Sequence, residues 1–215
     1  MTSPAPPGLL RFPLGPFQAN AYLLIGPSGT RAALIDPGLE AEGVLDAVRE
    51  RGLAVDWILN THGHLDHTAG NAAAKRATGA PLAIHREDVS WLSHLQAQGV
   101  AFGIPVEDSP EPDVVLEDGQ SLPFDGLQVE VLHTPGHSRG SVCFRVRDLL
   151  LVGDTLFRGS VGRTDLPGGS WDTLLRSIRE RLFTLPDGLA CWPGHGPETS
   201  LGEERRSNPF LAEAS

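Results

Sequence analysis

The segment from His62 to His67 places three histidines and an aspartate within six residues. Residues 55–60 before it are apolar enough for a buried strand, and the Ala-rich residues 68–78 after it predict a helix. The cluster therefore lies at the carboxyl end of a strand, where open α/β sheets place their ligand sites. Imidazole and carboxylate groups this close together suit zinc, iron or manganese, so the segment predicts a metal site.

Further metal-capable side chains follow other predicted strands. His137 lies in a Gly/Pro-rich turn between two apolar runs, and Asp154 and His195 each come directly after such a run. With the first cluster they make a set of seven: His62, His64, Asp66, His67, His137, Asp154 and His195. Seven groups are too many for one tetrahedral ion and suit two ions that share a bridging carboxylate. Paired ions ~3.5–4 Å apart can hold a hydroxide and polarise a carbonyl, so metal-assisted hydrolysis is the expected reaction class.

The elements that must position these groups are short strands and helices joined by turns rich in Gly and Pro. Apolar periodicity predicts an antiparallel meander, then alternating strands and helices. The predicted strands are 9–14, 20–25, 31–35, 55–60, 81–84, 114–116, 127–132, 142–146, 149–152 and 189–192, and the predicted helices are 39–52, 68–78, 87–98 and 171–183. We expect residues 1–8 to be a flexible tail and residues 9–215 to form a single domain.

The composition of the chain argues against several classes of binding partner. The formal net charge of −10 disfavours nonspecific binding to nucleic acid or to anionic membranes. The two cysteines, Cys143 and Cys191, lie in apolar runs and are expected to be buried, reduced thiols. No leader peptide or membrane-spanning run is recognisable, so we expect a cytoplasmic protein. The expected partner is a small-molecule thioester, with no nucleic acid and no membrane, and the oligomeric state is left open.

Four motifs, in order and with suitable spacing, resemble those of the metallo-β-lactamase superfamily. They are His-x-His-x-Asp-His at 62–67, Gly-His-Ser at 136–138, Gly-Asp at 153–154 and Pro-Gly-His-Gly at 193–196. The resemblance covers roughly residues 9–210. It implies an α+β fold, a four-layer αβ/βα sandwich with the metals at one edge between the sheets.

The same resemblance implies how the seven groups are shared between two divalent ions per chain. The first ion would take His62, His64 and His137, and the second would take Asp66, His67 and His195. Asp154 would bridge the two ions, and Asp66 is the candidate catalytic residue. Zinc is the expected metal, with iron or manganese as alternatives, since the same ligand types accept all three.

Within the superfamily the chain looks like the short bacterial type of glyoxalase II, the hydroxyacylglutathione hydrolases. Residues 16–22, 159–165 and 193–199 carry this likeness. It implies a metal-dependent hydrolase that cleaves a hydroxyacylglutathione-like thioester through a metal-bridging hydroxide. Class B1-type β-lactamases have a cysteine where Asp154 stands, and flavo-diiron proteins have a glutamate where His64 stands, so both branches are disfavoured.

The chain departs from the longer glyoxalase II enzymes, which carry a C-terminal helical extension that helps hold glutathione. Arg163 resembles a lysine of those enzymes that contacts glutathione, and a guanidinium could bind a substrate carboxylate bidentately. The alternative for Arg163 is an internal salt bridge to Asp165 or Asp172. Specificity for glutathione therefore stays open.

The sequence leaves two alternative activities open, as well as the roles of several other side chains. An iron-dependent persulfide dioxygenase would use His62, His137 and Asp154, although Gly194-His195-Gly196 looks more like a hydrolase. A nuclease of the superfamily is disfavoured by the acidic charge. Asp36 is either a turn-former or an acceptor that orients a metal-bound histidine. The remaining histidines, His85, His94 and His133, are expected to be structural, surface or orienting residues.

Overall fold

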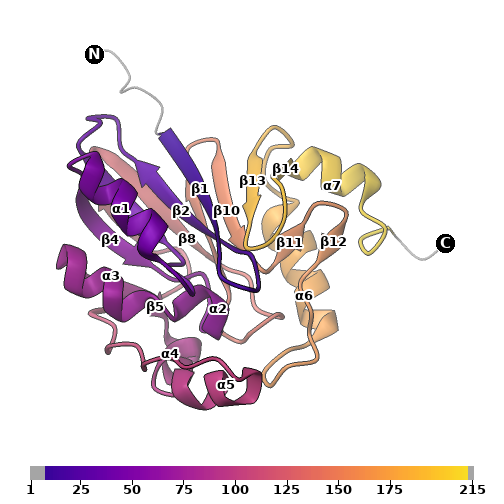
Figure 1. Ribbon diagram of the computed structural model, residues 1–215. Helices are drawn as coiled ribbons and strands as arrows, with labels where there is room; N and C mark the ends of the chain where they lie inside the picture. Colours follow the sequence, from indigo (N-terminus) through magenta and orange to yellow (C-terminus); the bar gives the residue numbers. More distant parts are fainter. Residues whose placement is uncertain (1–7, 213–215) are drawn as a thin grey trace.

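The computed structural model describes residues 8–212, which form two six-stranded sheets packed face to face (Figure 1). Residues 1–7 of the expected tail lie outside the described residues, and Gly8 already begins the first strand. No helix in the described range is both long and apolar enough to cross a bilayer. The two sheets with their covering helices confirm the predicted α+β sandwich.

The first sheet comes from the N-terminal half of the chain. In both chain order and spatial order its strands are β1 (Gly8–Leu14), β2 (Ala19–Ile25), β3 (Arg31–Ile35), β4 (Ala54–Leu59), β5 (Leu82–His85) and β6 (Val114–Leu116). The predicted antiparallel meander is confirmed in β1–β3, and β3 to β6 are parallel neighbours. Parallel neighbours need crossovers. Two of these connections contain the helices α1 (Glu42–Glu50) and α3 (Asn71–Thr78).

The second sheet comes from the C-terminal half. Its strands are β7 (Ser121–Phe124), β8 (Leu127–His133), β9 (Val142–Val146), β10 (Leu149–Gly153), β13 (Ala190–Pro193) and β14 (Thr199–Ser200), in the spatial order β14-β13-β10-β9-β8-β7. A separate hairpin of β11 (Leu156–Phe157) and β12 (Ser160–Val161) follows β10. The helices of this half are α6 (Trp171–Ser177), its π-helical continuation η2 (Ile178–Leu182), and α7 (Leu201–Ser207).

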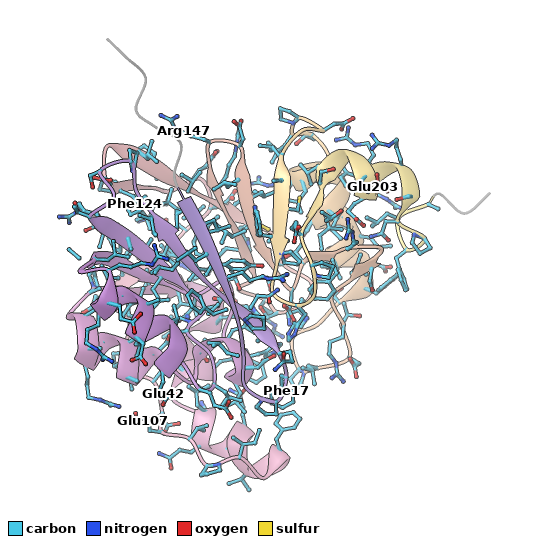
Figure 2. The ribbon with its side chains drawn as sticks, turned by 45° about the horizontal axis from the view of Figure 1, so that its top comes forward. Phe17, Glu42, Glu107, Phe124, Arg147 and Glu203 are labelled. Atoms are coloured by element: carbon cyan, nitrogen blue, oxygen red, sulfur yellow. The ribbon has the colours of Figure 1, made fainter. Side chains whose placement is uncertain are left out.

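Three apolar clusters explain why the layers stack as helix, sheet, sheet and helix. The cluster between the sheets holds Tyr22, Phe144 and Phe124, of which Phe124 is labelled in Figure 2. A second cluster packs the first sheet against α1 and α3, and a third packs the other sheet against α6, η2 and α7. Figure 1 shows α1 and α3 on one outer side and α6 and α7 on the other. Each sheet therefore buries both faces.

Two predicted helices are interrupted. The segment predicted as 87–98 folds as a 3₁₀ turn, η1 (Arg86–Asp88), followed by α4 (Val89–Leu92) and α5 (Leu95–Phe102). His94 leaves the helical conformation with φ −125°, and its ring lies 2.6 Å from the carbonyl of Ser90. The segment predicted as 68–78 is preceded by a single turn, α2 (Leu65–Thr68), and Gly70 then breaks the helix where its N–H donates to the Pro37 carbonyl.

The ends of several strands meet at one edge between the sheets. Asp36 follows β3, residues 60–64 follow β4, Asp154 follows β10 and His195 follows β13. Backbone hydrogen bonds join the two halves of the molecule here: Asn20 N–H donates to the Gly194 carbonyl at 2.7 Å, and Val142 N–H donates to the Thr61 carbonyl at 2.8 Å. The edge is therefore where the two sheets are joined.

Candidate metal centre

The structure brings all seven predicted ligand side chains to this edge. Two of the groups whose ligand atoms lie within 4.8 Å of one another match the predicted sets: His62 with His64 and His137, and Asp66 with His67 and His195. A third such group links them: His62, His67 and Asp154. The loops after β4, β8, β10 and β13 and the short helix α2 supply these side chains, so the site needs both sheets.

In the first set, two histidines are oriented by hydrogen bonds on one ring nitrogen. His62 Nδ1 lies 3.1 Å from the Thr61 hydroxyl, and His137 Nδ1 donates to the backbone carbonyl of Arg163 at 2.8 Å. The other ring nitrogen of His137, Nε2, then lies 2.9 Å from His64 Nδ1. Metal-bound histidines commonly hold their second nitrogen in this way, which fixes the tautomer and aims the lone pair.

Asp36 performs the same task for the second set. Its Oδ2 lies 3.2 Å from His67 Nδ1 and also accepts from the Thr61 hydroxyl at 2.6 Å, while Oδ1 accepts from the Thr61 N–H at 2.7 Å. The residue is buried and adopts φ +50°, an uncommon backbone conformation for a residue other than glycine. Of the two interpretations left open by the sequence, the structure favours the acceptor that orients a histidine.

Asp154 lies between the two sets. Its Oδ2 is 3.6 Å from His137 Nε2 and 3.6 Å from His195 Nε2, and its Oδ1 is 3.4 Å from His67 Nε2. Asp66 Oδ2 is 3.2 Å from His195 Nε2 on the far side of the second set. The Asp154 carboxylate therefore lies between the two sets, where the predicted bridging ligand would be.

Unpartnered buried atoms test whether the residues fit metal ions. Within the described residues, His62 Nε2, His64 Nε2 and Asp154 Oδ1 are buried and have no hydrogen-bond partner. Burying such groups unpaired is costly. Two of them, His62 Nε2 and Asp154 Oδ1, belong to side chains that meet in the linking group, so cations at the cluster would satisfy them. The residues present therefore fit divalent ions.

The electrostatics differ between the two sets. Burial, aided by His137, lowers the pKa of His64 to about 4, and burial lowers the pKa of His62 as well, so these rings are neutral ligands at physiological pH. Burial alone would lower the pKa of His67, but the carboxylates of Asp66 and Asp154 outweigh it and raise this pKa to about 10. The carboxylates around His67 thus favour a positive charge at this residue.

Gly194 of the Pro-Gly-His-Gly motif lies in close contact with two of the predicted ligands. A Cβ at this position would collide with the Asp154 carboxylate and would lie 2.8 Å from the His67 ring. The glycine therefore lets the backbone that carries His195 approach the central carboxylate. This explains on steric grounds why a glycine precedes the histidine in the Pro-Gly-His-Gly motif.

Sequence reasoning missed Asp88, a buried carboxylate on η1 that ties two ligand loops together. Its Oδ2 accepts from the Gly63 N–H at 2.9 Å and from the Ser138 hydroxyl at 2.6 Å, and its Oδ1 accepts from the Gly140 N–H at 2.7 Å. Gly63 stands between two predicted ligands, and Ser138 follows a third. The only local signal was an aspartate at the start of a predicted helix, which is ordinary for such a position.

Arg163 and His133 lie beside the cluster but not in it. The Arg163 guanidinium donates to both carboxylate oxygens of Asp165 at 2.7 Å and is 59% exposed, which matches the salt-bridge alternative. His133 stacks on His85, with ring centroids 4.1 Å apart. Of the sequence-predicted residues, Arg163 is thus the one whose side chain is engaged elsewhere, although it lines the cavity described next.

A cavity of about 640 Å³ opens directly onto the cluster. The predicted ligands that line it are His64, Asp66, His137, Asp154 and His195. The remaining walls are mostly apolar and come from the β1–β2 turn, α2, α4, α5, the β11–β12 hairpin and the loop after it. A small molecule in this cavity would therefore contact both ligand sets.

Comparisons with curated proteins find relatives along almost the whole chain. The chain is 42% identical over 205 residues to the probable metallo-hydrolase YqgX of Bacillus subtilis, covering 94% of this chain and 96% of that protein. It is 39% identical over 203 residues to the hydroxyacylglutathione hydrolase GloC of Haemophilus influenzae, covering 93% of this chain and 95% of the relative.

Solved structures agree in fold. BLEG-1, described as a B3 metallo-β-lactamase, is 36% identical with a TM-score of 0.89, covering 95% of this chain and 100% of its own. TTHA1623 in a di-iron-bound form is 42% identical with a TM-score of 0.86, covering 94% and 100%. ETHE1 from Myxococcus xanthus is 30% identical with a TM-score of 0.82, covering 97% and 86%.

The family model described as the metallo-beta-lactamase superfamily matches residues 14–195, which include every predicted ligand. The fold, the match and the relatives agree with the resemblance drawn from the four sequence motifs. A metal-dependent hydrolase is the class to which this evidence points. The chain belongs to the metallo-β-lactamase superfamily.

Proposed function

We propose that this chain is a dinuclear metal hydrolase that cleaves thioesters of the hydroxyacylglutathione type, with zinc as the first metal to test. The observation that carries the proposal is the pair of ligand sets joined at Asp154, since one ion would not need both. The similarity to a hydroxyacylglutathione hydrolase over nearly the full length of both chains supports the choice of substrate.

Each ligand set would hold one of the two ions. His62, His64 and His137 would hold one ion, and Asp66, His67 and His195 would hold the other, with Asp154 between them. When bound, such ions polarise a carbonyl and lower the pKa of water toward neutrality. The cavity would hold the thioester against the ligand edge and exclude bulk water.

Asp66 is the residue for which we propose a direct catalytic role. Its side chain is 21% exposed and lines the cavity, whereas His67 beside it is fully buried. Burial alone would raise the pKa of Asp66, but the neighbouring His67 and His195 outweigh it and hold this pKa below its ordinary value. The carboxylate is therefore ionised and can accept a hydrogen bond from the attacking water, which orients that water toward the thioester carbonyl.

The direct experiment is hydrolysis of S-lactoylglutathione by metal-analysed protein, with and without a chelator. Turnover that disappears with chelator, at about two metals per chain, is the expected result. His64→Ala and Asp66→Ala should each lower both metal content and turnover. Failure of a fully metallated protein to cleave the thioester would overturn the proposed substrate.

A second candidate is an iron-dependent persulfide dioxygenase, which is supported by the similarity to ETHE1. It would use His62, His137 and Asp154 and would leave Asp66 and His195 without a metal. Oxygen consumption with glutathione persulfide, at about one iron per chain, would identify this activity. If the protein is a hydrolase, it should consume no oxygen, and its turnover should require both ligand sets.

A further inference from the structure

The cavity beside the metal centre has two unlike flanks. We call one the aromatic flank, formed by Phe17, Leu65, Trp91, Gln98, Ala101 and Phe102. We call the other the hairpin flank, formed by Phe157, Ser160, Val161, Arg163, Leu166 and Pro167. In Figure 1, α5 and the β11–β12 hairpin, which belong to opposite flanks, lie apart at the bottom and on the right of the molecule.

The aromatic flank offers a ligand no charge, and its amide is already occupied. Gln98 Oε1 accepts from the Leu65 N–H at 3.0 Å, and Gln98 Nε2 donates to the Trp91 carbonyl at 3.3 Å. Each end of the side chain therefore makes one hydrogen bond within the flank itself. Because the other members of the flank are Phe, Leu, Trp and Ala, a polar group placed against this wall would lose hydrogen bonds to water and meet mostly hydrocarbon.

Two of its aromatic rings are exposed to solvent. Phe17 is 36% exposed and Phe102 is 57% exposed. They meet edge to face with ring centroids 5.3 Å apart, which joins the β1–β2 turn to the end of α5. Phe17 is labelled in Figure 2. Exposed apolar surface that lines a pocket is typical of a ligand site, because a bound apolar group would remove it from water.

The aromatic flank also reaches the metal centre. The Trp91 ring lies edge to face with the His64 ring, with centroids 5.1 Å apart. A carbonyl held at the ligand edge would thus have its substituent within reach of Trp91 and, further out, of Phe102 and Phe17. The apolar wall is continuous with the place where the proposed chemistry occurs.

The arginine that lines the cavity lies on the other side. Arg163 on the hairpin flank is paired with Asp165, and both side chains are more than half exposed. Exposed ion pairs contribute little, so exchanging Asp165 for a substrate carboxylate costs little. The carboxylates of a glutathione-like thiol would therefore lie along the hairpin flank, which leaves the aromatic flank for the acyl group.

We propose that the aromatic flank is an acyl subsite that selects thioesters with an apolar, aromatic acyl group over those with a small one. This inference rests on the proposed thioester hydrolysis and extends it to the acyl half of the substrate. Phe102 and Phe17 are the residues that determine this specificity, and Trp91 forms the inner wall next to the metal centre.

The test compares S-mandeloylglutathione with S-lactoylglutathione, which differ only in a phenyl group in place of a methyl group. The metal-loaded protein should show a kcat/KM about tenfold higher or more for the mandeloyl thioester, as expected for apolar pocket contacts. Phe102→Ala should lower kcat/KM for this substrate by about three- to tenfold. It should leave lactoyl hydrolysis within about twofold, since a methyl group does not reach Phe102.

Phe210→Ala is the matched control. Phe210 is also an exposed phenylalanine in an edge-to-face aromatic pair, with Trp171, but it is not among the cavity-lining residues. This variant should leave kcat/KM for both thioesters unchanged. Equal kcat/KM for the two thioesters in the unsubstituted protein, or an equal effect of Phe102→Ala on both, would overturn the acyl subsite while leaving the thioesterase intact.

A binding measurement separates failure of the subsite from failure of the proposed function. If neither thioester is hydrolysed, the proposed function is wrong, and calorimetry with the free acids mandelate and lactate still decides the subsite. Tighter binding of mandelate that is lost in Phe102→Ala supports it. Equal affinity for the two acids, or a preference that survives Phe102→Ala, overturns it.

Discussion

Asp88 accepts a 2.6 Å hydrogen bond from the Ser138 hydroxyl, a residue 50 positions further along the chain. The same carboxylate accepts from the Gly63 N–H, so it connects the loop that carries His62 and His64 with the turn that carries His137. The three histidines of the first set thus depend on one buried acceptor that is not itself among them.

Asp88→Asn should weaken metal binding at this first set by about tenfold or more, in line with other partners that orient metal ligands. Asparagine has one acceptor oxygen and an NH2 group that only donates, so the bonds from Gly63, Ser138 and Gly140 cannot all be kept. Chelator competition on the purified protein measures the affinity directly. Asp148→Asn, at an exposed aspartate, is the control. Unchanged affinity in Asp88→Asn would show that the loops hold their positions without this acceptor.

Gly194→Ala should reduce turnover by about a hundredfold or more, because small displacements of catalytic groups have effects of this size. The added Cβ would displace the Asp154 carboxylate or the backbone that carries His195. Metal analysis and steady-state kinetics on the same sample check this. Gly188→Ala, where a Cβ would meet nothing within 4 Å, should behave like the unsubstituted protein. Normal metal content and turnover in Gly194→Ala would contradict the steric argument.

His85 should make the fold less stable as the pH falls below neutrality. Burial, aided by the neighbouring His133, lowers the pKa of His85 to about 4, with Glu87 opposing. The pKa of His85 in the unfolded chain is about 6.5, so between pH 6.5 and the lower pKa of the folded state only the unfolded chain binds the proton. The free energy of unfolding is therefore independent of this group above that range and falls as the pH falls through it.

The expected size of this effect is about 1 kcal/mol between pH 7 and pH 5, allowing for partial solvent access. His85→Phe keeps a ring beside His133 but removes the titration. Urea unfolding of both proteins at the two pH values gives the difference. If the variant loses as much stability as the unsubstituted protein, His85 is not responsible.

The two thiols should be unreactive in the folded protein. Burial raises the pKa of Cys143 to about 11 and also raises the pKa of Cys191, and both are buried. Because the thiolate is the reactive form, iodoacetamide at pH 8 should label neither residue until the protein is unfolded. Mass spectrometry counts the labels, and Ser93→Cys, at an exposed position, supplies a thiol that should react at once. Rapid labelling of native Cys143 would show that its strand opens.

The sequence by itself predicted the metal-capable side chains and much of the local structure. Ligand types, their spacing and their positions after apolar runs depend on short-range pattern, and this predicted the cluster at His62–His67 and the strands on which the site is built. The break between α4 and α5 escaped prediction, because His94 leaves the helix through a contact with Ser90 that apolar periodicity does not reveal.

Only the tertiary structure decided which groups support the ligands. Asp36, Asp88 and the Arg163 carbonyl each hold a ligand loop or ring that is 25 or more residues away in the chain. Such hydrogen bonds depend on how segments that are distant in the chain pack together, and they leave no periodic signal in the sequence. The aromatic flank arises in the same way, because Phe17 and Phe102 become neighbours only when the β1–β2 turn meets α5.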